Sequence, residues 1–253
     1  MTQTNSDINS SGFVRELFNE MSRTYGVVNV VSSFGFCLRW RRQCLEGAGI
    51  HPNYTVCDLM SGVGELWPSV VRRLRHTGHI FGVDLSPAMS ERARKAATRL
   101  TIPINVLVED ALANSIQDGQ ADVVVSSFGL KTLNGEQLRI LAHQVARILK
   151  PGGKLSFVEI SVPPSGVLRK LYMFYVGRVI PVIGRLLLGN PENYRLLGVY
   201  TESFANCSQF LRHCADAGLR VQGQSYFFGC ATGVVGDRPA ARFNRRTPEP
   251  ICA

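Results

Sequence analysis

The chain has 253 residues, of which 45% are hydrophobic, so it is long enough to bury a sizeable core as one α/β domain. Residues 1–19 are polar and lack the apolar core of a signal peptide, and no apolar run is long enough to predict a membrane-spanning helix. The seven cysteines are scattered and odd in number, which favours reduced thiols over a disulfide scaffold. We therefore expect a single domain over residues 13–236, with flexible tails at 1–12 and 237–253.

The net charge of +9 indicates an anionic partner. Cations gather early in the chain and in its C-terminal tail, at Arg39, Arg41, Arg42, Arg238, Arg242, Arg245 and Arg246. No nucleic-acid-binding motif accompanies these arginines, so we expect no nucleic acid partner. The alternative is an anionic lipid surface, which predicts a peripheral protein at the cytoplasmic face of the inner membrane.

Residues 56–67, Val-Cys-Asp-Leu-Met-Ser-Gly-Val-Gly-Glu-Leu-Trp, form a strand-like run that ends in Asp58, followed by Gly62, Gly64 and a helix-like segment. Glycines at such a turn let the backbone reverse tightly and a ligand approach. A second strand-like run ends in Asp84, whose carboxylate can accept hydrogen bonds from both hydroxyls of a ribose. Together the two strand ends predict a nucleoside site. The alternative is an ordinary tight turn with two incidental acids.

The turn after Asp58 also distinguishes between two nucleosides. A dinucleotide site needs a third glycine and a helix N-terminus that receives a pyrophosphate, but here the acidic Glu65 follows Gly64. A carboxylate disfavours an anion at this position and favours the sulfonium and ammonium groups of S-adenosylmethionine (SAM). We therefore expect SAM rather than NAD as the cofactor.

Strand-like and helix-like segments alternate through most of the remaining chain. The predicted elements are strands at 104–109, 121–126 and 154–160, helices at 86–100, 135–149 and 207–217, and a hairpin from residue 220 onward. Such alternation predicts an α/β fold with a doubly wound, mostly parallel sheet that binds its ligands at the carboxyl ends of the strands. Asp110 then lies where the amino group of an adenine would donate to it.

Residues 167–188 interrupt the alternation with apolar and aromatic side chains at helical spacing. Pro181 predicts that this helix ends or kinks and forms a hairpin with the apolar turn that follows. Cations interrupt the apolar run, so the segment suits an interfacial helix, or a lid over an oily substrate at about 164–204. A core helix or the interface of a homo-oligomer explains the pattern equally well.

Several segments resemble the ubiquinone/menaquinone C-methyltransferase family of SAM-dependent enzymes, nearly end to end. They include residues 18–29 (Phe-Asn-Glu-Met-Ser-Arg-Thr-Tyr-Gly-Val-Val-Asn), the turn after Asp58, residues 126–130 (Ser-Ser-Phe-Gly-Leu) and Tyr194-Arg195. The turn is shared by most class I methyltransferases, whereas Ser-Phe-Gly-Leu with the later Tyr-Arg is specific to the quinone family. The resemblance implies a seven-stranded Rossmann-like sheet with a helical lid, and a SAM site formed by Tyr25, Asp58, Gly62, Gly64, Asp84, Asp110, Ala111 and Ser127.

The chain departs from this family beside the expected acceptor ring. The family carries Arg-Asn after Ser-Phe-Gly-Leu, where this chain has Lys131-Thr132, and a flexible point charge does not replace a planar guanidinium. The Asp-Leu-Met-Ser-Gly-Val-Gly-Glu turn resembles the rhodoquinone-forming branch of the family. That resemblance implies conversion of ubiquinone to rhodoquinone, in which an amino group from SAM replaces a ring methoxy group and a divalent metal such as manganese assists. The alternatives are C-methylation of a prenylated quinol and a non-catalytic SAM-binding scaffold.

For amino transfer, we expect Lys131 to donate to the developing enolate oxygen, and Glu65 or Glu159 to take the ammonium proton. The residues expected to contact the quinone are Tyr172, Tyr175, Arg178 and Tyr194. Each role has a structural alternative: a solvated Lys131, a core-edge Glu159, and tyrosines that only pack. No residues are assigned to the metal.

Overall fold

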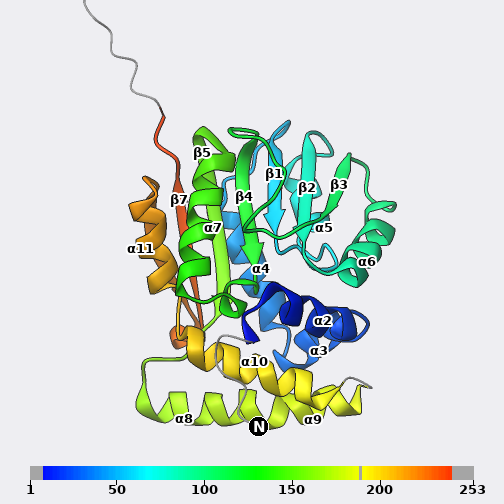
Figure 1. Cartoon of the computed structure of the whole chain (residues 1–253), viewed down its shortest axis with the longest axis vertical. Helices are drawn as coiled ribbons and strands as arrows, with labels where there is room; N and C mark the ends of the chain where they lie inside the picture. Colours follow the sequence, from blue (N-terminus) through cyan, green and yellow to red (C-terminus); the bar gives the residue numbers. More distant parts are fainter. Residues whose placement is uncertain (1–7, 188–189, 241–253) are drawn as a thin grey trace, which may run out of the picture.

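The computed structural model describes residues 8–187 and 190–240, and a seven-stranded sheet with the order β3-β2-β1-β4-β5-β7-β6 forms its centre (Figure 1). The strands are β1 (Thr55–Leu59), β2 (His79–Asp84), β3 (Ile104–Val108), β4 (Ala121–Ser127), β5 (Leu149–Ile160), β6 (Arg220–Tyr226) and β7 (Ala231–Asp237). β1 to β5 are parallel, whereas β7 is antiparallel to both β5 and β6. The predicted doubly wound, mostly parallel sheet and the predicted C-terminal hairpin are therefore confirmed.

Helices cover both faces of this sheet (Figure 1): α4 (Phe36–Gly47), α5 (Trp67–Arg73), α6 (Pro87–Ala97), α7 (Gly135–Ile148) and α11 (Ser208–Asp216). In β4, Val124 belongs to the core cluster that α7 and α11 complete, whereas Val123 and Val125 belong to the cluster that α4, α5 and α6 complete. Successive side chains of a strand point to opposite faces, so the two helix groups lie on opposite faces. The continuous apolar sequence of β4 follows from its burial on both sides.

Two helices on the carboxyl side of the sheet begin with side-chain caps. The Ser86 hydroxyl accepts a hydrogen bond from the Met89 N–H at 3.1 Å, with Pro87 in the first turn of α6. Asn134 and Gln137 form a reciprocal capping box at the start of α7. These caps fix where each helix leaves the carboxyl edge of the sheet.

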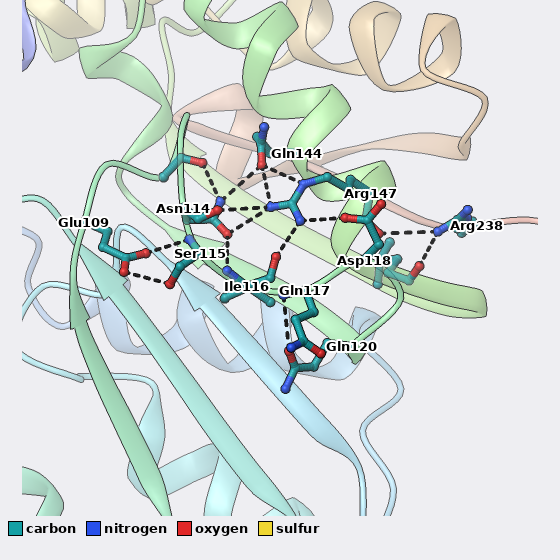
Figure 2. Close-up of polar contacts among 12 residues, drawn as sticks. Glu109, Asn114, Ser115, Ile116, Gln117, Asp118, Gln120, Gln144, Arg147 and Arg238 are labelled. Atoms are coloured by element: carbon teal, nitrogen blue, oxygen red, sulfur yellow. Dashed lines mark hydrogen bonds and ion pairs between the residues drawn. The ribbon is translucent and has the colours of Figure 1, made fainter.

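Arg147 of α7 fastens the segment between β3 and β4, as Figure 2 shows. Its Nη1 donates to the carbonyl of Ile116 at 2.5 Å and to Asp118 Oδ1 at 2.8 Å. Arg238, just after β7, donates from Nη1 to the carbonyl of Leu149 at 2.6 Å. Arg238 is therefore bound to the backbone at the end of α7 rather than free for a surface cluster. Arg242, Arg245 and Arg246 lie outside the described residues.

The N-terminal helices α2 (Ser11–Met21) and α3 (Tyr25–Ser32) lie across the carboxyl ends of the strands (Figure 1). Ile8 is buried ahead of α2, and Asp237 is the last residue of β7. Residues 8–12, 237 and 238 thus belong to the folded part of the chain, and the tails predicted at 1–12 and 237–253 do not begin at those boundaries. The remainder of each predicted tail lies outside the described residues.

The segment predicted to form a lid, called the lid below, consists of α8 (Gly166–Phe174), a π-helical turn η2 (Tyr175–Val179), α9 (Ile180–Leu186) and α10 (Pro191–Phe204). The hairpin predicted at Pro181 is wrong, because α8, η2 and α9 follow one line (Figure 1). The N–H of Ile180 donates to the carbonyl of Tyr175, and Pro181 falls in the first turn of α9, where its missing N–H is tolerated. α10 packs against η2 and α9. In the described part of the chain, no helix combines the length and apolarity of a membrane span.

Candidate functional site

The turn after β1 needs its glycines for different reasons. Gly62 has φ +57° and Gly64 has φ +79°, in the left-handed region that glycine adopts without strain. A Cβ on Gly64 would lie 2.4 Å from the Trp67 ring, whereas a Cβ on Gly62 would meet nothing within 4 Å. Packing therefore requires Gly64, and Gly62 leaves open space for a ligand.

Asp58 supports this turn from beneath. It is 1% exposed, and its Oδ2 accepts a hydrogen bond from Trp67 Nε1 at 2.9 Å. Burial raises the pKa of Asp58 to about 8, and the indole N–H opposes that rise. Asp58 does not line the cavities described below. The sequence predicts that Asp58 contacts the cofactor; in the structure it instead contacts Trp67, just after the glycine turn.

Asp84 closes the turn onto the end of β2. Its Oδ2 accepts from the Gly62 N–H at 2.7 Å, and its Oδ1 accepts from the Ser86 N–H at 2.9 Å. Burial raises the pKa of Asp84 to about 6, and these two donors oppose the rise. Each carboxylate oxygen can still accept another donor, which suits the two hydroxyls of a ribose.

A cavity of about 630 Å³, here called the strand-end cavity, opens at this turn and includes Tyr25, Gly62, Glu65, Asp84 and Ser127 in its wall. An adjoining hollow of about 430 Å³ shares Met60 and Asp84 with it and is also lined by Asp110 and Ala111. The Ser61 hydroxyl is buried in the cavity wall without a hydrogen-bond partner among the described residues. An unpaired hydroxyl, space at Gly62 and acids along the cavity fit a ligand of the size and polarity of SAM.

Asp110 lies at the far end of this hollow. Its Oδ1 accepts from the Leu112 N–H at 2.9 Å, and its Oδ2 accepts from the Ser11 hydroxyl at 2.7 Å. Ser11 begins α2, so the N-terminal helix covers the place predicted for the adenine.

A second cavity of about 1130 Å³, here called the apolar cavity, lies beyond Tyr25 and Phe128. These two residues line both cavities and form the wall between them. Phe128 has φ +67°, which is uncommon for a residue other than glycine. The other apolar and aromatic lining comes from α3, α4, β5, the lid and the 3-10 turn η3 (Phe227–Gly229), and includes Phe34, Phe36, Cys37, Trp40, Ile160, Tyr172, Tyr175, Val176, Phe227 and Cys230.

Lys131, on the 3-10 turn η1 (Leu130–Thr132), brings a charged group to the wall of the apolar cavity. Its Nζ lies 3.1 Å from Glu159 Oε1 and donates to the carbonyl of Phe128 at 2.5 Å. The side chains of Lys131 and Glu159 are 2% and 0% exposed. The interpretation of Lys131 as a solvated residue is therefore wrong.

Glu159 is the counter-ion of Lys131 and does not itself line the cavity. Its Oε2 accepts from the Lys131 N–H at 3.1 Å, and its Oε1 also accepts from the Ile160 N–H at 2.8 Å. With both oxygens held in this way, Glu159 is poorly placed to take a proton from a reacting group. Its hydrogen-bond partners are the Lys131 ammonium and two backbone N–H groups, so Glu159 is a fully paired buried carboxylate.

Glu65 lines the strand-end cavity and forms an ion pair with Arg41 of α4. Burial raises the pKa of Glu65, and Arg41 opposes that rise. Arg41 is only 5% exposed, so its predicted place in a surface cluster is wrong, whereas Arg39 and Arg42 are exposed. Glu65 is thus not a free base in this structure.

Tyr172 and Tyr175 line the apolar cavity, where the sequence predicts contacts with the quinone. Their hydroxyls donate to the carbonyls of Cys230 at 3.3 Å and Ser32 at 2.7 Å. Burial raises the pKa of both phenols. The two tyrosines therefore connect the lid to η3 and α3 as well as lining the cavity.

Arg178 and Tyr194 do not line either cavity. Arg178 is exposed on η2. Tyr194 is 0% exposed, its hydroxyl lies 2.8 Å from Thr24 Oγ1, and its ring fills the space beside Gly184. The structure therefore does not place Arg178 or Tyr194 where a quinone in either cavity would contact them. Tyr194 instead packs the lid onto the N-terminal helices.

Sequence reasoning missed the contribution of α4 to the apolar cavity. Phe36, Cys37 and Trp40 lie at helical spacing on one face of α4, and that spacing was an available signal. No group of three or more His, Cys, Asp or Glu side chains suited to a metal ion occurs in the described ranges. We therefore assign no residue to the expected manganese.

The strand order, the antiparallel β7, the glycine turn after β1 and the acid at the end of β2 define the class I SAM-dependent methyltransferase fold. A SAM-dependent methyltransferase from Aquifex aeolicus has a TM-score of 0.55 and 19% identity over 78% of this chain and 89% of that chain. Geranyl diphosphate C-methyltransferase from Streptomyces coelicolor A3(2) has a TM-score of 0.56 and 16% identity over 78% of each chain. At these identities the likeness shows the fold alone.

The chain belongs to the ubiE/COQ5 methyltransferase family, whose model matches residues 2–237. Demethylmenaquinone methyltransferase from Thermus thermophilus is 33% identical over 224 residues, which are 88% of this chain and 100% of that protein. A ubiquinone/menaquinone biosynthesis C-methyltransferase from Hydrogenovibrio crunogenus is 31% identical over 186 residues, 73% of this chain and 72% of that protein. The predicted family is confirmed, whereas the comparisons do not distinguish its rhodoquinone-forming branch.

Proposed function

We propose that this chain uses SAM to modify the ring of a prenylated quinone. One observation carries the proposal: the polar strand-end cavity and the larger apolar cavity share Tyr25 and Phe128 as their common wall. A reactive group held in the first is therefore next to a ring held in the second. The relatives named for demethylmenaquinone and for ubiquinone/menaquinone biosynthesis support a quinone ring as the acceptor.

On the cofactor side, SAM when bound supplies an activated group on its sulfonium. Asp84 would accept the ribose hydroxyls, and Asp110 with Ala111 would bind the adenine. Gly62 would let the backbone approach the ligand, and Ser127, next to Phe128 in sequence, also lines the strand-end cavity. Asp58 does not line either space and would act indirectly, by accepting the indole N–H of Trp67.

On the acceptor side, Lys131 would donate to an oxygen on the quinone ring. The ammonium group has three protons, and the structure assigns two of them to Glu159 and the Phe128 carbonyl. The third is available to a ligand in the apolar cavity. A donor fixed in advance in an apolar cavity stabilises negative charge that develops on a ring oxygen when the ring reacts.

Ring C-methylation is the first candidate reaction, because the named relatives support it. Amino transfer from SAM, with loss of a ring methoxy group as in rhodoquinone formation, is the second candidate. The feature in its favour is that Lys131 lines the apolar cavity, whereas the resemblance implies Arg-Asn at residues 131 and 132 in the methylating family. Lys131 would stabilise a charged ring oxygen in either reaction.

The rim of the apolar cavity supports contact with an anionic membrane, and we propose this at the cytoplasmic face of the inner membrane. Phe34 is 81% exposed, and Phe228, next to the cavity residue Phe227, is 79% exposed. The lid adds exposed cations at Arg169, Lys170, Arg178 and Arg185. Apolar side chains beside cations are typical of helices that lie in the interface of a membrane. Flotation with anionic but not neutral vesicles would test this, and self-association through the same rim is the competing outcome.

Mass spectrometry of the quinone tests the proposed function. Purified protein would be incubated with SAM, with and without manganese, and with either a short-tail demethylmenaquinol or a short-tail ubiquinone. Methylation adds about 14 mass units, whereas exchange of methoxy for amino removes about 15 and carries the label of ¹⁵N-SAM. Binding of SAM without either change would contradict the proposal and support a scaffold.

A further inference from the structure

The ion pair between Arg41 and Glu65 sits where the strand-end cavity meets its wall with the apolar cavity. Glu65 lines the strand-end cavity, and Arg41 lies behind it on α4 with 5% exposure. The Arg41 guanidinium carbon is 5.2 Å from the centre of the Phe128 ring, so the same arginine contacts the wall between the cavities. The pair therefore connects the cofactor side to the acceptor side.

Only one oxygen of Glu65 is occupied. Arg41 Nη2 donates to Oε2, whereas Oε1 has no hydrogen-bond donor among the described residues. A Cβ on Gly26 would lie 3.2 Å from Oε1, which places that oxygen beside Tyr25 at the wall. The side chain of Glu65 keeps 21% exposure toward the cavity. Oε1 is thus a carboxylate oxygen available to a cationic ligand group.

The geometry points to Glu65 as the receptor for the α-ammonium group of SAM, with Arg41 as its positioning residue. Asp84 and Asp110 mark the nucleoside end of the binding region, and Tyr25 and Phe128 mark the end where the sulfonium must meet the acceptor. The amino-acid end of SAM then falls at Glu65. A half-buried carboxylate held by an arginine keeps its charge, and a second cation on its free oxygen completes its neutralisation.

Arg41 is itself incompletely paired, which separates this ion pair from a purely structural one. Its Nε is buried without a hydrogen-bond partner in the described part of the chain. Burying a guanidinium with an unpaired N–H costs free energy, so Arg41 is not explained by a contribution to stability alone. A role in holding Glu65 and supporting Phe128 explains why the arginine lies there.

Ligand binding without turnover tests this inference, which rests on SAM being the cofactor in the proposed function. Calorimetry would compare S-adenosylhomocysteine with its desamino analogue, which lacks only the α-ammonium group. The wild-type protein should prefer S-adenosylhomocysteine by about tenfold or more, the scale of a charge-assisted hydrogen bond. Glu65→Gln should remove that preference while binding the desamino analogue as well as the wild type does.

Arg41→Met tests the positioning role through the pH profile. Without the guanidinium, burial alone acts on Glu65, so the preference for the ammonium should weaken at pH 6 and return at higher pH. Arg41→Lys, which keeps a cation, should restore part of the preference at pH 6. The control is Arg42→Gln, because Arg42 lies next to Arg41 but forms only an exposed pair with Glu46 at 2.9 Å. It should bind both ligands as the wild type does.

Equal weakening of both ligands in Glu65→Gln, or no change in either, would overturn the inference. Either result would leave the proposed function intact. Failure of the wild-type protein to bind S-adenosylhomocysteine would instead overturn the SAM assignment itself. Circular dichroism of each variant separates lost recognition from lost folding.

Discussion

The two cavities differ in how the chain builds them. The polar groups of the strand-end cavity come mainly from the turn after β1 and the end of β2, two neighbouring strands close together in sequence, while α2, Tyr25 and Ser127 complete its wall. The apolar cavity instead gathers side chains from α3 to η3, almost two hundred residues apart, around one buried ion pair. The sheet therefore determines the geometry of the cofactor site. The acceptor site is lined by helices distant in sequence, so substitutions there can alter which ligand binds without altering the sheet.

Removing the charge from the apolar cavity should have the largest effect. Lys131→Met leaves Glu159 buried without its ammonium partner, and breaking a buried pair in this way costs about 3–5 kcal/mol of unfolding free energy. The double variant Lys131→Met with Glu159→Gln should recover most of that loss, yet still fail to modify a quinone. Urea denaturation and the mass-spectrometric assay measure the two effects. An active double variant would remove Lys131 from the mechanism.

The strand-end cavity should respond to Asp84→Ala mainly in ligand affinity. Loss of a carboxylate that accepts both ribose hydroxyls should weaken S-adenosylhomocysteine by about a hundredfold or more, given about 1.5–3 kcal/mol for each charged hydrogen bond. Calorimetry would measure it, with short-tail quinone binding as the matched readout for the other cavity. If quinone affinity fell equally, the variant would have damaged the fold rather than the site.

The two glycines of the turn provide a matched pair of substitutions. Gly64→Ala places a Cβ 2.4 Å from the Trp67 ring at φ +79°, and should lower the unfolding free energy by about 2 kcal/mol or more. Gly62→Ala meets nothing within 4 Å, so it should cost about 1 kcal/mol from its φ alone while obstructing the ligand. Thermal unfolding and S-adenosylhomocysteine titration separate these outcomes. Equal destabilisation by both would contradict the geometry.

Acid should weaken ligand binding in the strand-end cavity through Asp84. The pKa of Asp84 is raised to about 6, so below that pH the carboxyl becomes protonated, and S-adenosylhomocysteine affinity should fall by up to about tenfold per pH unit. The unfolding free energy of the ligand-free protein changes with pH in the opposite direction to the ligand affinity. Because the folded pKa is raised above its ordinary value, ionisation costs the fold stability as pH rises from about 4 through 6. Titrations and denaturation at pH 5 and 7, with Asp84→Asn as the variant that lacks this one titration, check both signs.

Charges outside both cavities should matter least. Arg42 forms an exposed pair with Glu46, so Arg42→Gln should change the unfolding free energy by less than about 0.5 kcal/mol and leave ligand binding unchanged. Denaturation and calorimetry provide the comparison. An effect as large as that of Lys131→Met would contradict the assignment of Arg42 to the surface outside both cavities.

The same contrast explains what could be predicted from the sequence. The sequence predicts the turn at Gly62 and Gly64 and the acid at Asp84, because the conformation of a turn depends on residues that are adjacent in sequence. It does not predict the partner of Lys131, since Glu159 comes close only when β4 and β5 pair in register. The effect of Pro181 is also not predictable from its neighbours in sequence. A π turn precedes it, so Pro181 lies in the first turn of α9 and does not break the helical segment.

The claim that the apolar cavity holds the quinone ring can be tested most directly through Trp40. The chain has 2 tryptophans; Trp40 lines this cavity, whereas Trp67 is fully buried beneath the turn. A short-tail ubiquinone should quench Trp40 emission saturably in the wild-type protein, and Trp40→Phe should lose that saturable component while retaining Trp67 emission. Identical, non-saturating quenching of the two proteins would contradict the assignment of the quinone to this cavity.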